Sequence, residues 1–329
     1  MNRRPALVAA LVAALSLGLA ACSSSDPAPQ AEPEASSAPD ADSPRAVTIG
    51  ALTISETAPL WAAVDAGIFA EHGLDVTVQP IQGGAQAMPA LINGDIDFSL
   101  GQPFGAMRAS LQGLDVAIVA NYAQSLTEGD DINSVVVGAG SDITSPADLA
   151  GKKVAVNSLG AAGDLTIMAA VEEDGGDPGT IEFVEVAFPD AQAQLAAGNI
   201  DAAWVPEPFV SMIVGGGGAR VVDPYQAVLP GLPTLVLQTT GATVTDDPEL
   251  VDAVREALTA AFAWAAENDE AMRASLVTEM SLPEAAAAGL PLPEFSTEID
   301  QEVLQGLADL AVQYEFFDQA PDLDELIHQ

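Results

Sequence analysis

One short phrase occurs twice in this chain, once in each half. The letters "GDID" at 94–97 match "GNID" at 198–201, and Pro-Phe follows each copy, at 103–104 and 208–209. Each copy comes after an alanine-rich segment with helical spacing and precedes a short apolar run. A glycine that ends a helix and an Ile-Asp that begins a strand are therefore expected in both halves. The repeat predicts two lobes of similar topology.

The rest of the chain alternates between β-branched runs and helical segments, a pattern typical of βαβ units with a parallel sheet. We therefore expect an α/β fold with two lobes that close like a clamshell. Each lobe should hold a mostly parallel sheet with flanking helices, and two crossing strands should join the lobes. The cleft is expected at the carboxyl ends of the strands. The expected bounds are 46–138 for lobe one, completed by 238–329, and 139–237 for lobe two, with crossings near 135–137 and 235–237.

The first residues are typical of an export signal. Arg3 and Arg4 precede a short apolar run, so residues 1–21 are expected to be a signal peptide. The letters "LAAC" resemble a bacterial lipobox, in which Cys22 becomes the lipid-modified first residue; an ordinary secretory signal with a chance cysteine is the alternative. Apart from Cys22, Gln30 and Arg45, residues 22–45 are Ser, Pro, Ala and acidic residues. The stretch has no large apolar side chain and should form a disordered tether. The expected location is the outer face of the cytoplasmic membrane, anchored by lipid.

The charge balance and the histidines exclude several classes of protein. The chain has 48 acidic residues against 9 basic ones, so no basic cluster is available to bind nucleic acid. His72 lies in a helix-ending turn and His328 beside the terminus, and neither position suits a catalytic base. Phosphate-binding glycine motifs and Cys/His zinc clusters are absent from the sequence. We therefore expect no enzyme activity, no cofactor and no metal.

Four segments, taken in order, resemble periplasmic-type substrate-binding proteins of ABC importers, with a likeness to the nitrate, sulfonate, taurine and thiamine-precursor branch. They are "WAAVDAGIFAEHGLDV", "GGAQAMPALINGDIDFSL", "DLAGKKVAV" and "QLAAGNIDAAWVPEPF". The resemblance implies a type II periplasmic-binding-protein fold in a monomer that captures a small-molecule solute by lobe closure. Its partners would be an ABC permease and the ATPase of that permease. A biosynthetic enzyme of the same fold, acting on a small heterocycle, is the alternative, but such relatives are not exported behind a lipobox.

Ligand contacts are expected from loops that follow strands and open helices, because backbone N–H groups are unpaired there. Ser55, Thr57 and Ser158 suit helix caps equally well. Arg108 is expected a turn or two down its helix, pointing away from the cleft. The expected ligand-binding residues are Ser55, Glu56, Thr57, Gly83, Gly84, Gln86, Gln102, Asn121, Tyr122, Ser158, Gly160, Asp190, Trp204 and Glu207.

These loops carry both hydrogen-bond donors and hydrogen-bond acceptors. The helix N-termini at 83–84 and 158–160 suit an anionic or acceptor end of a ligand, while Glu56, Asp190 and Glu207 suit a cationic or N–H-bearing end. We therefore expect a ligand with both characters, either an aminosulfonate such as taurine or an amine-bearing heterocycle such as a thiamine-precursor pyrimidine.

Overall fold

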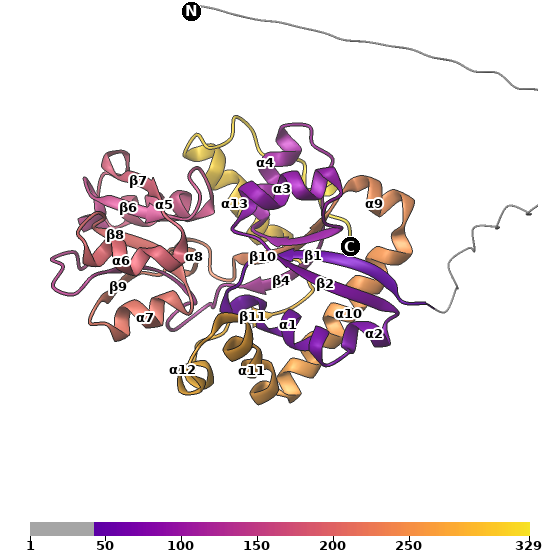
Figure 1. The fold of residues 1–329 in the computed structure, drawn as a ribbon. Helices are drawn as coiled ribbons and strands as arrows, with labels where there is room; N and C mark the ends of the chain where they lie inside the picture. The colour runs from indigo at the N-terminus through magenta and orange to yellow at the C-terminus, as the bar shows by residue number, and fades with distance from the viewer. Residues whose placement is uncertain (1–42) are drawn as a thin grey trace, which may run out of the picture. The chain divides into compact units, whose positions relative to one another are not determined.

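The computed structural model describes residues 43–329. The expected signal peptide, Cys22 and nearly all of the expected tether lie outside the described residues. The described chain holds two β-sheets, each with helices packed against it (Figure 1). We call the six-stranded sheet with its helices the first lobe, and the five-stranded sheet with its helices the second lobe. No helix among residues 43–329 is long and apolar enough to cross a membrane.

The six-stranded sheet has the order β11-β4-β10-β3-β1-β2, and the five-stranded sheet has the order β7-β6-β8-β5-β9. The strands are β1 Arg45–Ala51, β2 Leu74–Pro80, β3 Phe98–Gly101, β4 Ala117–Gln124, β5 Asn133–Val137, β6 Lys153–Val156, β7 Glu182–Glu185, β8 Ala202–Pro206, β9 Ala219–Val222, β10 Pro233–Thr239 and β11 Glu294–Phe295.

The two sheets follow one plan. In the first lobe, β1 pairs in parallel with β2 and β3, and β10 pairs antiparallel with β3 and β4. In the second lobe, β6 pairs in parallel with β7 and β8, and β5 pairs antiparallel with β8 and β9. Each sheet thus has one antiparallel strand beside its parallel set. The expected two-lobed α/β class is confirmed, with mixed rather than wholly parallel sheets.

The sequence repeat occupies the same place in both lobes. The Asp97 carboxylate accepts a hydrogen bond from the backbone N–H of Thr48 at 2.7 Å, and the Asp201 carboxylate accepts one from the N–H of Lys153 at 2.8 Å. Each aspartate also donates its own N–H to the carbonyl of the same partner. The glycine that begins each copy has a left-handed φ, 74° and 68°. The phrase therefore ends a helix and fastens the third strand of each parallel set, β3 or β8, to the first strand of that set, β1 or β6.

For two strands, the sheet that the strand joins differs from the lobe to which the expected bounds assign it. β5 falls within the stretch expected for lobe one but pairs in the five-stranded sheet. β10 pairs along its whole length in the six-stranded sheet, although its first residues were expected in lobe two. The chain thus crosses between lobes after β4 and before β10. A buried apolar strand looks alike in sequence in either sheet, so its pattern does not reveal which sheet it joins.

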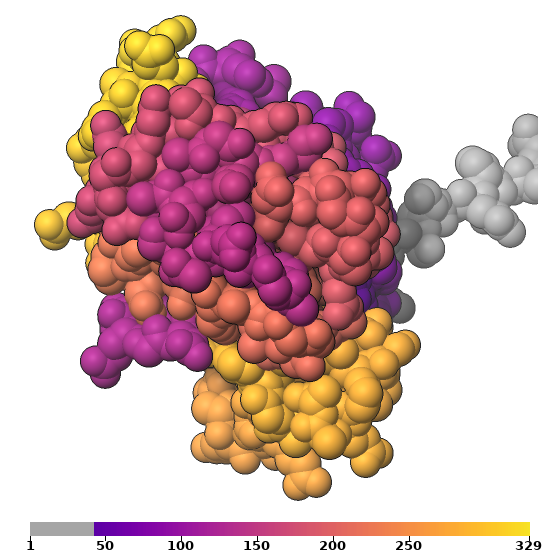
Figure 2. Space-filling view, turned by 90° about the vertical axis from the view of Figure 1, so that its left-hand side faces the viewer, coloured from indigo at the N-terminus to yellow at the C-terminus, as the bar shows by residue number. Residues whose placement is uncertain are grey.

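The helices cover both sheets, and α11 and α12 project beyond the rounded surface of the second lobe in the side view (Figure 2). Apolar side chains of both sheets belong to one continuous core. A smaller cluster lies between α1, α11 and α12. The helices are α1 Ala58–Asp65, α2 Ile68–Glu71, α3 Gly84–Asn93, α4 Pro103–Leu111, α5 Ala162–Glu173, α6 Ala191–Ala196, α7 Phe209–Gly215, α8 Pro224–Val228, α9 Gly241–Asp246, α10 Pro248–Glu267, α11 Asp269–Met280, α12 Glu284–Gly289, α13 Gln301–Gln313 and α14 Leu323–Leu326.

Candidate ligand-binding cleft

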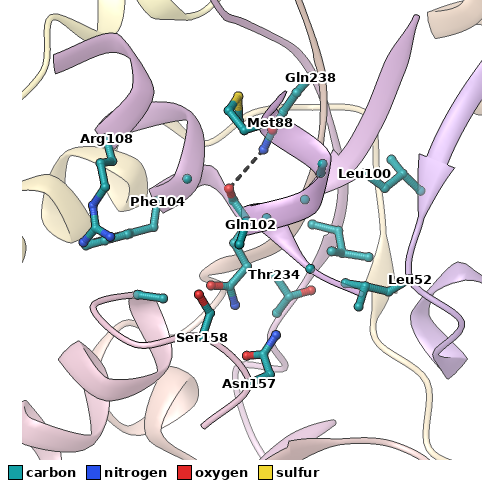
Figure 3. A pocket seen from close by; sticks show the side chains of 18 of the residues that line it. Leu52, Met88, Leu100, Gln102, Phe104, Arg108, Asn157, Ser158, Thr234 and Gln238 are labelled. Atoms are coloured by element: carbon teal, nitrogen blue, oxygen red, sulfur yellow. Dashed lines mark hydrogen bonds between the residues drawn. The ribbon is translucent and has the colours of Figure 1, made fainter. Parts of the chain in front are cut away.

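A cavity of about 440 Å³ lies between the two sheets and is lined from both lobes. The first lobe contributes the loops after β1, β2 and β3, together with α4 and β10. The second lobe contributes the loop after β6, the start of β5 and the end of β8. Figure 3 shows the side chains of Asn157 and Ser158 facing those of Gln102 and Thr234 across this space. The cleft therefore lies at the carboxyl ends of the parallel strands, where such sites are common.

Six of the expected residues line the cavity. They lie in loops, at the start of a helix or on a strand beside the other lobe. These residues are Glu56, Gly83, Gly84, Gln102, Ser158 and Trp204. Their ligand contacts remain a prediction.

Three expected residues are buried beside the cavity, where their hydrogen bonds connect different segments of the chain: Ser55, Thr57 and Glu207. The Ser55 hydroxyl and N–H donate to the backbone carbonyl of Glu207 at 3.0 and 3.3 Å, which links the two lobes. The Thr57 hydroxyl donates to the carbonyls of Leu52 and Ile54. The Glu207 carboxylate accepts from both the N–H and the hydroxyl of Ser211 at 3.0 Å. Their polar atoms are therefore already engaged within the protein.

Four further expected residues also lie off the cavity lining. β4 continues to Gln124, so Asn121 and Tyr122 are buried strand residues and not loop residues, and the Tyr122 hydroxyl accepts from an N–H of α1. Gln86 is exposed and its side chain closes the turn before α3 by accepting from the N–H of Gln82. Asp190 is exposed at the end of a short 3-10 turn. None of these four lines the cavity.

The expectation for Arg108 is wrong, because its side chain reaches the cavity wall. The guanidinium lies 5.0 Å from the ring centroid of Phe104 (Figure 3). It lies 5.9 Å from the ring centroid of Phe317, and both distances are within the range of a cation–π contact. It also donates a hydrogen bond to the carbonyl of Gly160 in the opposite lobe. The long side chain extends from α4 to the second lobe, so a position one or two turns along the helix does not keep the guanidinium out of the cleft.

The helix N-terminus expected at 158–160 is occupied by the protein itself. The Asp164 carboxylate accepts hydrogen bonds from the N–H groups of Gly160 and Ala161 at 2.5 and 2.6 Å. These are the donors that an anionic ligand would need at the start of α5. A second anion there would meet the Asp164 charge. In the first lobe, Gly83 and Gly84 at the start of α3 remain on the cavity wall.

Several lining residues were absent from the expected set, and two of them stand at the lobe crossings. Asn133 is the first residue of β5 and Thr234 is the second residue of β10. Both are buried, with exposed fractions of 3% and 2%. Gln238 on the same strand donates to the carbonyl of Gln102 at 3.0 Å (Figure 3). The crossings themselves were the signal that could have found these residues, since a crossing strand must pass the cleft.

Glu56 has the most unusual electrostatic environment on the cavity wall. Its exposed fraction is 2%, and burial raises its pKa from 4.5 to about 7 because a charged carboxylate loses its hydration. The polar groups of Thr234 and Asn133 lower this pKa in part, while the negative charge of Asp131 raises it further. One carboxylate oxygen, Oε1, has no hydrogen-bond partner within the described protein. Glu56 can therefore change its charge near neutral pH.

Comparison with known proteins finds a matching family model and relatives that are named as binding proteins. A family model described as NMT1/THI5 like matches residues 54–272. The formylaminopyrimidine-binding protein of Halalkalibacterium halodurans is 26% identical over 224 residues, 67% of this chain and 66% of that protein. The taurine-binding periplasmic protein of Escherichia coli is 30% identical over 191 residues, 57% of this chain and 56% of that protein. The match spans less than two thirds of the length of each of these relatives.

Solved structures share the fold along nearly the whole described chain. The alkanesulfonate-binding protein SsuA from Xanthomonas axonopodis pv. citri, bound to MOPS, has a TM-score of 0.74 at 19% identity, covering 88% of this chain and 99% of that one. The periplasmic nitrate-binding protein NrtA from Synechocystis has a TM-score of 0.72 at 16% identity, with 87% and 86% covered. With the two-lobed architecture and the cleft between the sheets, the match of the family model to more than half of the sequence shows that this chain belongs to the NMT1/THI5-like family.

Proposed function

We propose that this protein is the extracytoplasmic solute-binding component of an ABC importer. It captures a small polar solute between its lobes and delivers it to a membrane permease driven by an ATPase. The observation that carries the proposal is a cavity lined from both sheets, with buried polar atoms of each lobe left without partners. The curated relatives are named as binding proteins for formylaminopyrimidine and taurine, which supports binding rather than catalysis.

Capture depends on relative motion of the lobes about the two crossings. Near these crossings, Arg220 donates to the carbonyl of Asp131 at 2.8 Å and to the carboxylate of Asp223 at 2.9 Å, and it forms an ion pair with Glu207 at 3.4 Å. These contacts fasten both crossing segments to the second lobe. The Ser55 hydrogen bond to Glu207 links the second lobe to the first. A solute that touches both lobes favours the closed arrangement by its differential affinity.

Anchoring belongs to the same proposal. A lipid on Cys22 and a loose tether would hold the folded lobes near the permease while leaving them free to close. Mass spectrometry of the mature protein should find a diacylglycerol-modified N-terminal cysteine, and Cys22→Ser should release the protein from the membrane fraction. An unmodified Cys22 in the membrane-bound protein would contradict the anchor without touching the binding role.

The binding role is tested with a thermal-shift panel of aminopyrimidines, taurine, alkyl sulfonates and nitrate. One class should raise the unfolding temperature, because a ligand at a hundred times its Kd stabilises by about 2.7 kcal/mol. Gln102→Ala should reduce the shift, since Gln102 lines the cavity. Gln86→Ala is the matched control, because Gln86 is exposed and off the cavity lining. A panel extended to other small solutes that never stabilises the protein would contradict the proposed function.

A further inference from the structure

The helix α13, close to the C-terminus, contacts both lobes (Figure 1). It packs against α4 of the first lobe and against α5 of the second lobe. Its apolar face, formed by Leu304, Leu307, Ala308 and Ala311, is buried in the core that the two sheets share. The chain on either side of α13 belongs to the first lobe, because β11 pairs with β4 and α14 packs against β4. The helix therefore reaches from the first lobe onto the second.

Two contacts join α13 to the second lobe. The hydroxyl of Tyr314, the residue that ends α13, donates a hydrogen bond to the carboxylate of Glu172 on α5. About two turns earlier, Gly306 lies against Leu229 at the end of α8, so closely that a Cβ on the glycine would lie 3.0 Å from the leucine Cδ2. The helix is thus held to the second lobe at two places along its length.

The turn after α13 is held to the first lobe by aromatic packing. The ring of Phe317 stacks on that of Phe104 on α4, with centroids 4.6 Å apart, and the ring of Phe316 meets Phe104 edge-on at 6.1 Å. Phe104 and Phe317 are both buried. Buried aromatic pairs bury large areas and have a defined geometry, whereas the bond between Tyr314 and Glu172 lies at the surface. The contact with the first lobe is therefore the firmer of the two.

Arg108 belongs to the same junction. Its guanidinium lies over the rings of Phe104 and Phe317, and it donates to the carbonyl of Gly160 in the second lobe. The Phe317 ring limits the positions that the long side chain can take. The turn after α13 thereby supports another bond between the lobes.

We propose that α13 and the turn after it, residues 301–317, form a strap that stays packed on the first lobe and restrains the second lobe from swinging open. Its releasable end is the hydrogen bond between Tyr314 and Glu172, since water can solvate both groups when they part. Burial and the Glu172 carboxylate raise the pKa of Tyr314 to about 12, so the hydroxyl keeps its proton and donates at neutral pH. The strap acts with or without a solute, so its test needs none.

Double electron–electron resonance without solute measures the restraint. Spin labels on cysteines that replace Ile92 on α3 and Met212 on α7 report the distance between the lobes, with Cys22 replaced by serine. Tyr314→Phe removes the hydroxyl and keeps the ring. The ratio of open to closed protein should rise about threefold or more in this variant, because a hydrogen bond to a charged group is lost.

Glu172→Ala should open the lobes to the same degree, because it removes the acceptor of the same bond. The double variant of Tyr314→Phe with Glu172→Ala should open them no further than either single variant, since both act through one contact. Glu173→Ala is the matched control. Glu173 is the next residue of α5 and is also exposed, but its carboxylate makes no hydrogen bond to Tyr314 in the described protein. This variant should keep the wild-type distances.

Phe317→Leu probes the end of the strap that is anchored on the first lobe. It removes the ring that stacks on Phe104 and lies against Arg108. The ratio of open to closed protein should rise here too, because both the strap and the guanidinium lose their support. Urea unfolding confirms that each variant is folded before its distances are measured.

Distances that stay unchanged in both Tyr314→Phe and Glu172→Ala would refute the strap. A double variant that opens the lobes by the product of the two single effects would also refute it, because the two residues would then act separately. Either result leaves the proposed function standing, since that function is tested by the stabilisation of the protein by a solute.

Discussion

Replacing Glu56 by Gln should make the protein more stable at neutral and alkaline pH. The buried carboxyl group keeps its proton up to about pH 7 in the folded protein, whereas in the unfolded chain it titrates near 4.5. Below pH 4.5 both states carry the proton, so the group imposes no penalty. Between pH 4.5 and 7 the unfolded state loses the proton first, so the free energy of unfolding falls as pH rises. Above pH 7 the folded state ionises too, and the loss levels off.

The magnitude follows from the size of the pKa difference. A rise from 4.5 to about 7, at 1.36 kcal/mol for each pKa unit, corresponds to about 3 kcal/mol of stability lost by pH 8. Glutamine has the same shape and carries no charge at any pH. The stability of Glu56→Gln relative to wild type should therefore rise by about 3 kcal/mol between pH 4 and pH 8. A constant packing difference between the two side chains would not change this slope.

Urea unfolding of both proteins across this range measures the difference directly. Glu185→Gln is the matched control, because Glu185 is an exposed carboxylate on the same cavity. Its free energy of unfolding should stay within about 0.5 kcal/mol of wild type, as is usual for surface substitutions. A difference between Glu56→Gln and wild type that stays constant or falls with pH would refute the assignment of Glu56 as a buried carboxyl group that resists ionisation.

Four other substitutions probe the fold and the cleft. Gly218→Ala should lower the free energy of unfolding by about 2–4 kcal/mol. The reason is that a Cβ at this position would lie 2.9 Å from the Ile213 carbonyl oxygen and closer still to that of Val137. Urea unfolding checks this, with Gly289→Ala as the control because a Cβ there meets open space. Asp97→Ala and Asp201→Ala should each lower the free energy of unfolding by about 1–2 kcal/mol in the same assay, since each carboxylate bonds to an N–H of the first parallel strand of its lobe, β1 or β6. A large loss from only one of the two would contradict their equivalence. Arg108→Gln should increase the radius of gyration of the solute-free protein in small-angle scattering, because the Gly160 contact between lobes is lost; an unchanged radius would show that Arg108 does not hold the lobes.

Much of the architecture could be predicted from the sequence because each copy of the repeat carries its structural signals within a few neighbouring residues. A glycine with left-handed φ ends each helix, and the aspartate that follows fastens β3 to β1 in one lobe and β8 to β6 in the other, so both signals lie within a few residues. Glu56 and Gln102 were found because the loops that follow parallel strands lie together at one edge of a sheet.

The site residues that were missed or misplaced depend on how parts of the chain that are distant in sequence pack together. Asn133 and Thr234 were missed because nothing in an apolar strand says which sheet it enters, and both stand where the chain changes lobes. Arg108 was misplaced because its reach depends on the packing of α4 against the second lobe. Asn121 and Tyr122 were expected in a loop because β4 runs further than its turn signals suggested.

The central claim is that a small solute draws the two lobes together. Ile92 on α3 and Met212 on α7 lie in different lobes with exposed fractions of 39% and 47%, so each can carry a spin label after replacement by cysteine. Cys22, the single cysteine of the chain, is replaced by serine in this variant. Double electron–electron resonance should give a broad distance distribution without solute and a narrower, shorter one when the solute identified by thermal shift is saturating. An identical distribution with and without that solute would contradict capture by lobe closure.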